Sequence, residues 1–187
     1  MKNQDLYQLF IDELADMYSS EHQIVKSLPK LIQLASLTDL KDGLKQHLEE
    51  TKNQVKRIEK IFSILDLPAK EIPCEAMAGL VKEAASLTEN RVQSAVLDAA
   101  IISACLKIEH YEIASYNTLR SFAKHLGLDS AVIDLIKANL DEENSADKKL
   151  TKIADGTLLF SGVNKDAAEV GTYATGSTGA IGPKPRR

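Results

Sequence analysis

The stretch LKIEHYEIASY, residues 106–116, places two carboxylates inside a run that otherwise has the pattern of a buried helix. Glu109 and Glu112 are three residues apart, so they point to the same side of a helix. Apolar residues such as Leu106 and Ile113 surround them. An ionised carboxylate is unfavourable in apolar surroundings unless a cation compensates its charge. The pair therefore indicates a candidate metal site, with a solvated flank or a buried salt bridge as the alternatives.

Helical periodicity extends outward from this stretch over most of the chain. Long helices are expected over residues 4–34, 39–67, 89–126 and 130–154. Short links join the first helix to the second and the third to the fourth, so each pair should form an antiparallel hairpin. About twenty residues between the pairs are enough to cross a bundle and to include a short helix. The sequence therefore predicts an all-α, ferritin-like four-helix bundle made of two antiparallel hairpins joined by a long crossover.

The predicted bundle occupies residues 1–155, and the C-terminal segment differs in composition. From Gly156 onward the helical periodicity fades, and the end of the chain is rich in Gly, Thr and Ala. Such low-complexity sequence is typical of a disordered tail. Residues 156–187 are therefore predicted to be a low-complexity tail, disordered over 171–187, whereas residues 156–170 either dock on the bundle or continue the tail.

Composition excludes several classes of function. The net charge of −4 argues against sequence-independent nucleic-acid binding, which depends on clustered Lys and Arg. Met1 leads directly into an amphipathic run without a signal peptide, and no apolar stretch approaches the roughly 20 residues of a membrane span. Two cysteines are too few for a disulfide framework or a four-cysteine zinc site. These features predict a cytoplasmic protein without nucleic-acid or membrane partners.

The other three long helices also carry an acid within the apolar face. These acids are Glu21 on the first helix, Glu50 on the second and Glu143 on the fourth. Residues equally far from the turn of an antiparallel hairpin lie level with one another. Glu21 and Glu50 are centred on the first link, and Glu109 and Glu143 are centred on the second. Each acid then lies about 21–26 Å from its turn at 1.5 Å per residue, so the four should meet near mid-height.

Further polar residues share faces with these acids. His47 lies three residues before Glu50, and Asp147 lies four residues after Glu143. Carboxylates together with one imidazole suit iron or manganese, so we predict a site for two metal ions, iron in first place and manganese as the alternative. The predicted ligands are Glu21, His47, Glu50, Glu109, Glu112, Glu143 and Asp147. Gln54 and Tyr116 lie one turn further along and are candidate hydrogen-bond donors to these ligands.

Five blocks of the sequence resemble, in order, the YciE/YciF-like family of the ferritin-like, rubrerythrin-related superfamily. The blocks are DELADMYSSEHQI (12–24), HLEETKNQVKRIEKIF (47–62), CEAMAGLVKEA (74–84), KIEHYEIASYNTL (107–119) and LDEENSADKKL (140–150). The resemblance covers about residues 4–155. It implies a bacterial, stress-associated four-helix bundle, commonly dimeric, with a dimetal centre at mid-bundle.

The sequence departs from the ferritin-like pattern of Glu plus Glu-x-x-His in each half. Asn53 and Ala146 stand where the two histidines are expected. Two classes of function therefore stay open. The first is a dimetal protein, preferably diiron, that handles dioxygen or peroxide as an oxidase, peroxidase or catalase-like enzyme. The second is a non-catalytic structural or stress-response bundle whose acids hold metal only for stability or hold none.

A homodimer is also expected from the sequence. The crossover carries apolar residues, among them Ile72, Met77, Leu80 and Val81. A core formed by four helices alone has no need of these side chains, so they are predicted to contact a second copy of the chain.

Overall fold

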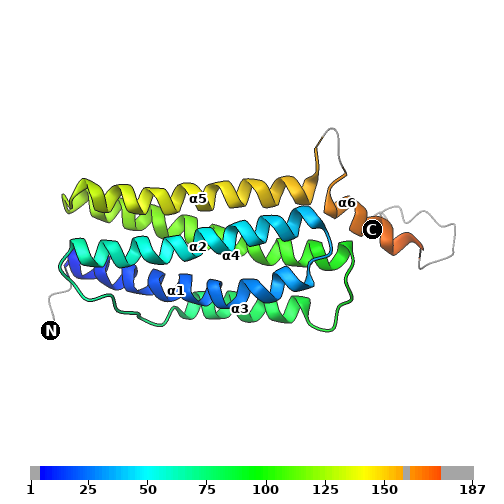
Figure 1. Ribbon diagram of the computed structural model, residues 1–187, viewed down its shortest axis with the longest axis horizontal. Coiled ribbons are helices and arrows are strands. Elements are labelled where there is room, and N and C mark those ends of the chain that lie inside the picture. Colours follow the sequence, from blue (N-terminus) through cyan, green and yellow to red (C-terminus); the bar gives the residue numbers. More distant parts are fainter. Residues whose placement is uncertain (1–4, 158–160, 174–187) are drawn as a thin grey trace, which may run out of the picture.

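The computed structural model describes residues 5–157 and 161–173, which contain six α-helices. Their bounds are Leu6–Leu34 for α1, Thr38–Ile64 for α2, Glu75–Thr88 for α3, Ala95–His125 for α4, Ser130–Asp155 for α5 and Val163–Tyr173 for α6. The four long helices run side by side along the long axis of the molecule (Figure 1). The short helix α3 lies alongside them, and α6 lies at one end.

The connections between the helices match the predicted topology. α1 and α2 form one hairpin, α4 and α5 form the other, and the pairs meet through contacts of α1 with α4 and of α2 with α5. The crossover from α2 to α4 runs along the bundle and includes α3, which packs against α1 and α4 (Figure 1). The prediction of two antiparallel hairpins joined by a long crossover with a short helix is confirmed.

Local sequence sets the ends of the second hairpin. Ser94 and Asp129 precede α4 and α5, and each side chain accepts a hydrogen bond from a backbone N–H in the first turn. Gly127 follows α4 with a φ of 64°, a left-handed conformation that glycine adopts without steric cost. α4 begins at Ala95 and not near residue 89, because Ser94 provides the cap.

A buried carboxylate ties the two hairpins together at one end of the bundle. Asp98 of α4 is 2% exposed and accepts hydrogen bonds from the backbone N–H groups of Ser36, at 2.7 Å, and Leu37, at 3.0 Å. The Ser36 hydroxyl also donates to Asp98, at 2.5 Å. Because charge-assisted hydrogen bonds are the strong ones, this contact holds the α1–α2 link at a defined height against α4. The alignment of acids from different hairpins depends on that height.

The apolar core is divided into two clusters along the bundle axis. On α1 one cluster reaches Ile24 and the other reaches Tyr18, and Glu21 lies between them. On α2 the first cluster contains Leu44 and the second contains Val55. Buried polar side chains fill the interval on both helices. A polar layer therefore separates two apolar cores near mid-height.

The segment after residue 155 is part of the same fold as far as the structure describes it. α6 packs against α4 and α5, and Val163 is 4% exposed within the first apolar cluster. Gly162 allows the close turn, because a Cβ there would lie 2.3 Å from the backbone of Asp155 and Gly156. In the structure residues 161–170 therefore lie against the bundle, and the domain boundary at residue 155 stays a prediction. Residues 171–173 are helical as the end of α6, and the disorder predicted for residues 174–187 lies outside the described residues.

The apolar side chains of the crossover face the bundle. Met77 is fully buried, and Leu80 and Val81 are partly buried against the first apolar cluster. Ile72 packs on the second cluster, and its backbone N–H donates to the Ala15 carbonyl at 3.2 Å. The reason given for a homodimer is therefore wrong, because this chain covers these residues itself. The homodimer stays a prediction.

Candidate metal centre

Five ionisable side chains are buried together in the polar layer. The carboxylates of Glu21, Glu109, Glu112 and Glu143 are at most 1% exposed, and His47 is 6% exposed. α1 contributes one of these residues, α2 one, α4 two and α5 one. We call these five residues the acid–histidine cluster.

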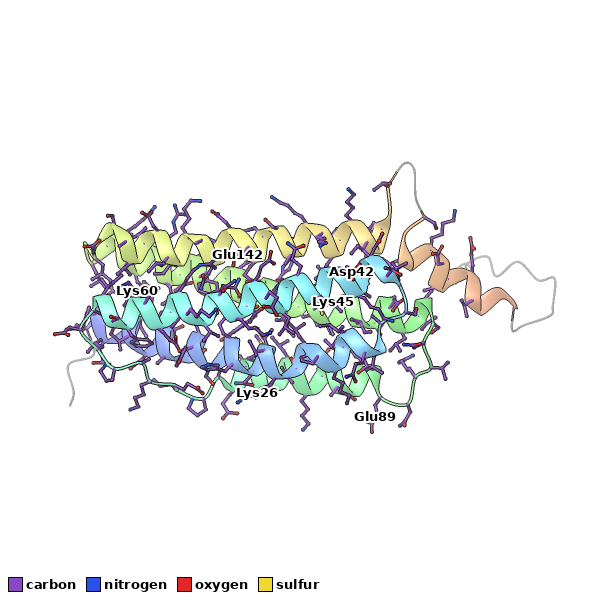
Figure 2. The ribbon with its side chains drawn as sticks, viewed as in Figure 1. Lys26, Asp42, Lys45, Lys60, Glu89 and Glu142 are labelled. Atoms are coloured by element: carbon purple, nitrogen blue, oxygen red, sulfur yellow. The ribbon has the colours of Figure 1, made fainter. Side chains whose placement is uncertain are left out.

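Most other charged side chains of the bundle lie at its surface, so the burial of these five groups is unusual. Charged residues such as Lys26, Lys45, Lys60 and Glu89 are exposed and lie on the outside of the bundle (Figure 2). Removing several carboxylates from water is costly unless charge pairing or metal coordination compensates for the lost solvation. The acid–histidine cluster therefore requires a physical reason.

The donor atoms of the cluster lie close enough to share a cation. His47, Glu109, Glu112 and Glu143 can each offer one ligand atom, and these atoms all lie within 4.8 Å of one another. His47 Nε2 lies 3.3 Å from Glu109 Oε1, outside hydrogen-bond geometry. Three helices thus direct oxygen and nitrogen donors to one point.

Most of these donors have no hydrogen-bond partner within the described part of the chain. Both carboxylate oxygens of Glu112 are unpaired, as is Oε2 of Glu21, Glu109 and Glu143. Both ring nitrogens of His47 are also without a hydrogen bond. Buried polar atoms are nearly always paired in folded proteins, so a group of unpaired acceptors needs an explanation. A bound cation would satisfy them together, and the donor set fits transition-metal ions.

Burial and mutual repulsion shift the titration of three of the carboxyls. The pKa of Glu21 is raised well above its ordinary value by burial and by the charge of Glu143. The pKa of Glu109 is raised by burial and again by Glu143, and that of Glu112 by burial, then by Glu21 and Glu143. These carboxyls therefore resist ionisation unless positive charge enters the site.

A directed chain of hydrogen bonds connects Glu21 to the surface. Arg57 Nη1 donates to Asn139 Oδ1 at 3.0 Å, and Asn139 Nδ2 donates to the Tyr116 hydroxyl at 2.9 Å. The Tyr116 hydroxyl in turn donates to Glu21 Oε1. At the outer end, Glu142 of α5 accepts two hydrogen bonds from Arg57, each at 2.6 Å. From Arg57 to Glu21 each of the three hydrogen bonds is donated inward, so the chain holds Oε1 of Glu21 and leaves Oε2 for the cluster.

Glu143 is held in the same way by one neighbour. Gln54 is fully buried, and its side-chain N–H donates to Glu143 Oε1. The expectation that Gln54 and Tyr116 donate to the clustered acids is confirmed. Asn139 was missed, although its position four residues before Glu143 on the same face was a usable signal.

Two of the predicted ligands lie outside this group of unpaired donors. Glu50 is half-buried, and its Oε1 accepts a hydrogen bond from Gln46 at 2.7 Å. Asp147 is also half-buried, and its Oδ1 lies 3.0 Å from Nε2 of the exposed His110. α2 is oriented so that His47 points into the cluster, and Glu50 therefore lies at the edge of the buried face of this helix. The structure thus brings together five of the seven predicted residues, and a ligand role stays a prediction for all seven.

The fold consists of two hairpins joined by a long crossover, and all four long helices contribute a carboxylate or an imidazole to its buried polar layer. These features place the protein in the class of ferritin-like four-helix bundles. The chain belongs to the family described as "Domain of unknown function (DUF892)", which matches residues 5–168. The predicted resemblance to the YciE/YciF-like proteins is confirmed by similarity to Protein YciF of Escherichia coli (strain K12). The two sequences are 40% identical over 168 residues, which is 89% of this chain and 98% of YciF.

Solved structures agree with this assignment. The E. coli stress protein YciF matches with a TM-score of 0.76 over 81% of this chain and 94% of its own, at 40% identity. YcfI from Rhodopseudomonas palustris matches with a TM-score of 0.78 over 82% and 97%, also at 40% identity. A bacterioferritin-related protein from Bacteroides fragilis, described as a dodecameric thioferritin, is 16% identical with a TM-score of 0.63 over 91% and 92%. This last similarity concerns the fold alone.

None of the helices in the described residues combines the length and the apolar character needed to cross a membrane.

Proposed function

We propose that the acid–histidine cluster binds a pair of transition-metal ions, iron in first place or manganese, and that the site handles dioxygen or peroxide. The observation that carries this proposal is the set of buried donors on four helices, most of which have no other partner in the described residues. Hard carboxylate oxygens together with one imidazole are a donor set that iron and manganese accept.

The chain's own residues would have distinct roles in this site. His47, Glu109, Glu112 and Glu143 would hold one ion directly, and Glu21 would extend the donor set toward a second. Glu50 and Asp147, which lie beside the cluster, are proposed to complete the set. Bound iron or manganese would supply Lewis-acid and one-electron redox chemistry at this position.

The surrounding residues would orient these ligands and control protons. Burial and the charge of Glu21 raise the pKa of Tyr116 well above its ordinary value, so its hydroxyl stays protonated and continues to donate to Glu21. Gln54 holds Glu143 in the same manner. The apolar clusters on either side lower the local dielectric constant, which strengthens the electrostatic interactions in the layer.

A second candidate is a non-catalytic bundle in which the acids hold metal only for stability or hold none. The observation in its favour is that His47 is the one imidazole in the cluster, because Asn53 and Ala146 occupy the positions of the pattern's histidines. A structural role has also been suggested for the relative YcfI.

Metal content and turnover separate the two candidates. We expect protein purified without added metal to contain iron or manganese, and to reach about two ions per chain after loading. Elemental analysis gives the content, and oxygen and peroxide electrodes give turnover. Bound metal with turnover supports the dimetal enzyme, whereas bound metal without turnover supports the structural role. Absence of metal after loading would overturn the metal proposal.

We further propose that the protein is a cytoplasmic homodimer or a larger symmetric oligomer. Leu6, Tyr7 and Leu9 at the start of α1 are each more than a third exposed, so these apolar side chains are available for contact with a second copy of the chain. Multi-angle light scattering at micromolar concentration should give at least twice the mass of 20.5 kDa. A monomer mass throughout this range would contradict the proposal.

A further inference from the structure

A cavity between α2 and α5 reaches the acid–histidine cluster from the surface. Its volume is about 80 Å³, and α2 and α5 lie next to each other along this side of the bundle (Figure 1). His47 lines the cavity and is also one of the clustered donors, so the cavity meets the cluster at this imidazole. Glu50, the predicted ligand on the flank, also lines it.

Two small residues leave this space open. Gly43 lies inside α2, where glycine is less favourable than alanine, and a Cβ there would meet Lys149 Cε at 3.4 Å and Ile153 Cδ1 at 3.9 Å. These are ordinary contact distances, so the packing tolerates a methyl group that the sequence omits. Ala146 lies on the opposite wall, at the position three residues after Glu143 where the ferritin-like pattern has a histidine. The cavity therefore lies where the ferritin-like pattern would place a histidine side chain.

The chemistry of the walls favours a small uncharged molecule. Leu44, Leu150 and Ile153 make the inner surface mainly apolar. At the rim, Lys149 Nζ donates to Gln46 Oε1 at 2.9 Å, and Gln46 Nε2 donates to Glu50 Oε1 at 2.7 Å. The Lys149 ammonium and the Glu50 carboxylate both line the cavity, so their charges balance, and the apolar wall disfavours the entry of ions of either sign.

We infer that this cavity is the route by which small uncharged oxidants, dioxygen or hydrogen peroxide, reach the donors at His47. The inference rests on the proposed function, and it assigns Gly43 and Ala146 as the residues that set the size of the opening. A larger side chain at either position blocks the route without altering a ligand.

The test uses the full chain loaded with metal, with hydrogen peroxide as the probe. The variants are Gly43→Val and Ala146→Leu, and the control is Gly79→Val, in α3 with no atom within 4 Å of its added Cβ. At equal metal content and equal helicity, both cavity variants should react with peroxide at least about tenfold more slowly than wild type in stopped flow, because access limits the reaction. The control should keep the wild-type rate. A wild-type rate in a cavity variant would overturn the route.

A second measurement does not depend on bound metal. Xenon binds in small apolar cavities, so xenon NMR or a crystal under xenon pressure should show occupancy in wild type and in Gly79→Val. Occupancy should be lost in Gly43→Val. Xenon absent from wild type, or retained in Gly43→Val, would overturn the inferred route. If wild type fails to hold metal but binds xenon as described, the proposed metal function fails while the open cavity stands.

Discussion

Replacing Glu109 with glutamine should lower metal occupancy by more than about tenfold and leave the metal-free protein at least as stable as wild type. Glu109 is 1% exposed and contributes one of the four donors that lie within 4.8 Å. Glutamine keeps the shape of the side chain and removes its charge. Burial and Glu143 raise the pKa of Glu109, which means that its ionised form is unfavourable in the metal-free site. Its removal should therefore leave the metal-free protein at pH 7 as stable as wild type or more stable.

Removing the metal from the wild-type protein should lower its free energy of unfolding. A ligand present at about a thousand times its dissociation constant stabilises the native state by about 4 kcal/mol, and a chelator should abolish that contribution. Urea unfolding and elemental analysis measure both effects. Glu49→Gln is a matched control on α2, because Glu49 is exposed and pairs with Lys52 at the surface. It should change neither metal content nor the effect of chelation. Unchanged metal content in Glu109→Gln would remove this residue from the ligand set.

The metal-free protein should lose stability as the pH rises from 5 to 8, whereas the metal-loaded protein should gain it. The pKa values of Glu21, Glu109 and Glu112 are raised above 4.5 in the folded state, so the native state binds more protons than the unfolded state above that pH. Their contribution to stability is present below pH 4.5 and is lost as the pH rises through the raised values. Each proton held by the native state gives a slope of about 1.4 kcal/mol per pH unit.

Bound metal reverses this dependence, because ligands must lose their protons to coordinate and protons compete with the metal. The measurement is urea unfolding at pH 5, 6, 7 and 8, with chelator and with saturating metal. Glu112→Gln should flatten the slope of the metal-free protein, because it removes a carboxyl whose pKa is raised by burial and by Glu21 and Glu143. Parallel slopes with and without metal would contradict the argument that the same carboxyls titrate and coordinate.

Most of the fold could be read from the sequence, because periodicity and link length are local properties of the chain. The apolar repeat defined the long helices, and the lengths of the links defined the hairpins. The position of α6 was left open, because among the described side chains of α6 only Val163 is buried, and the close approach of Gly162 to the end of α5 produces no periodic signal. The start of α4 was placed too early for a similar reason, since the Ser94 cap interrupts a run that otherwise reads as helical.

For the candidate site, the sequence by itself determined that the acids lie at the same height along the bundle axis. The reason is that the rise per residue fixes the distance of each acid from its hairpin turn. Only the tertiary structure decided which acids point inward, since the rotation of each helix about its axis is set by packing against its neighbours. That rotation turns His47 into the cluster and leaves Glu50 on the flank. The chain of hydrogen bonds from Arg57 to Glu21 likewise joins four helices, and no spacing within one helix records such a contact.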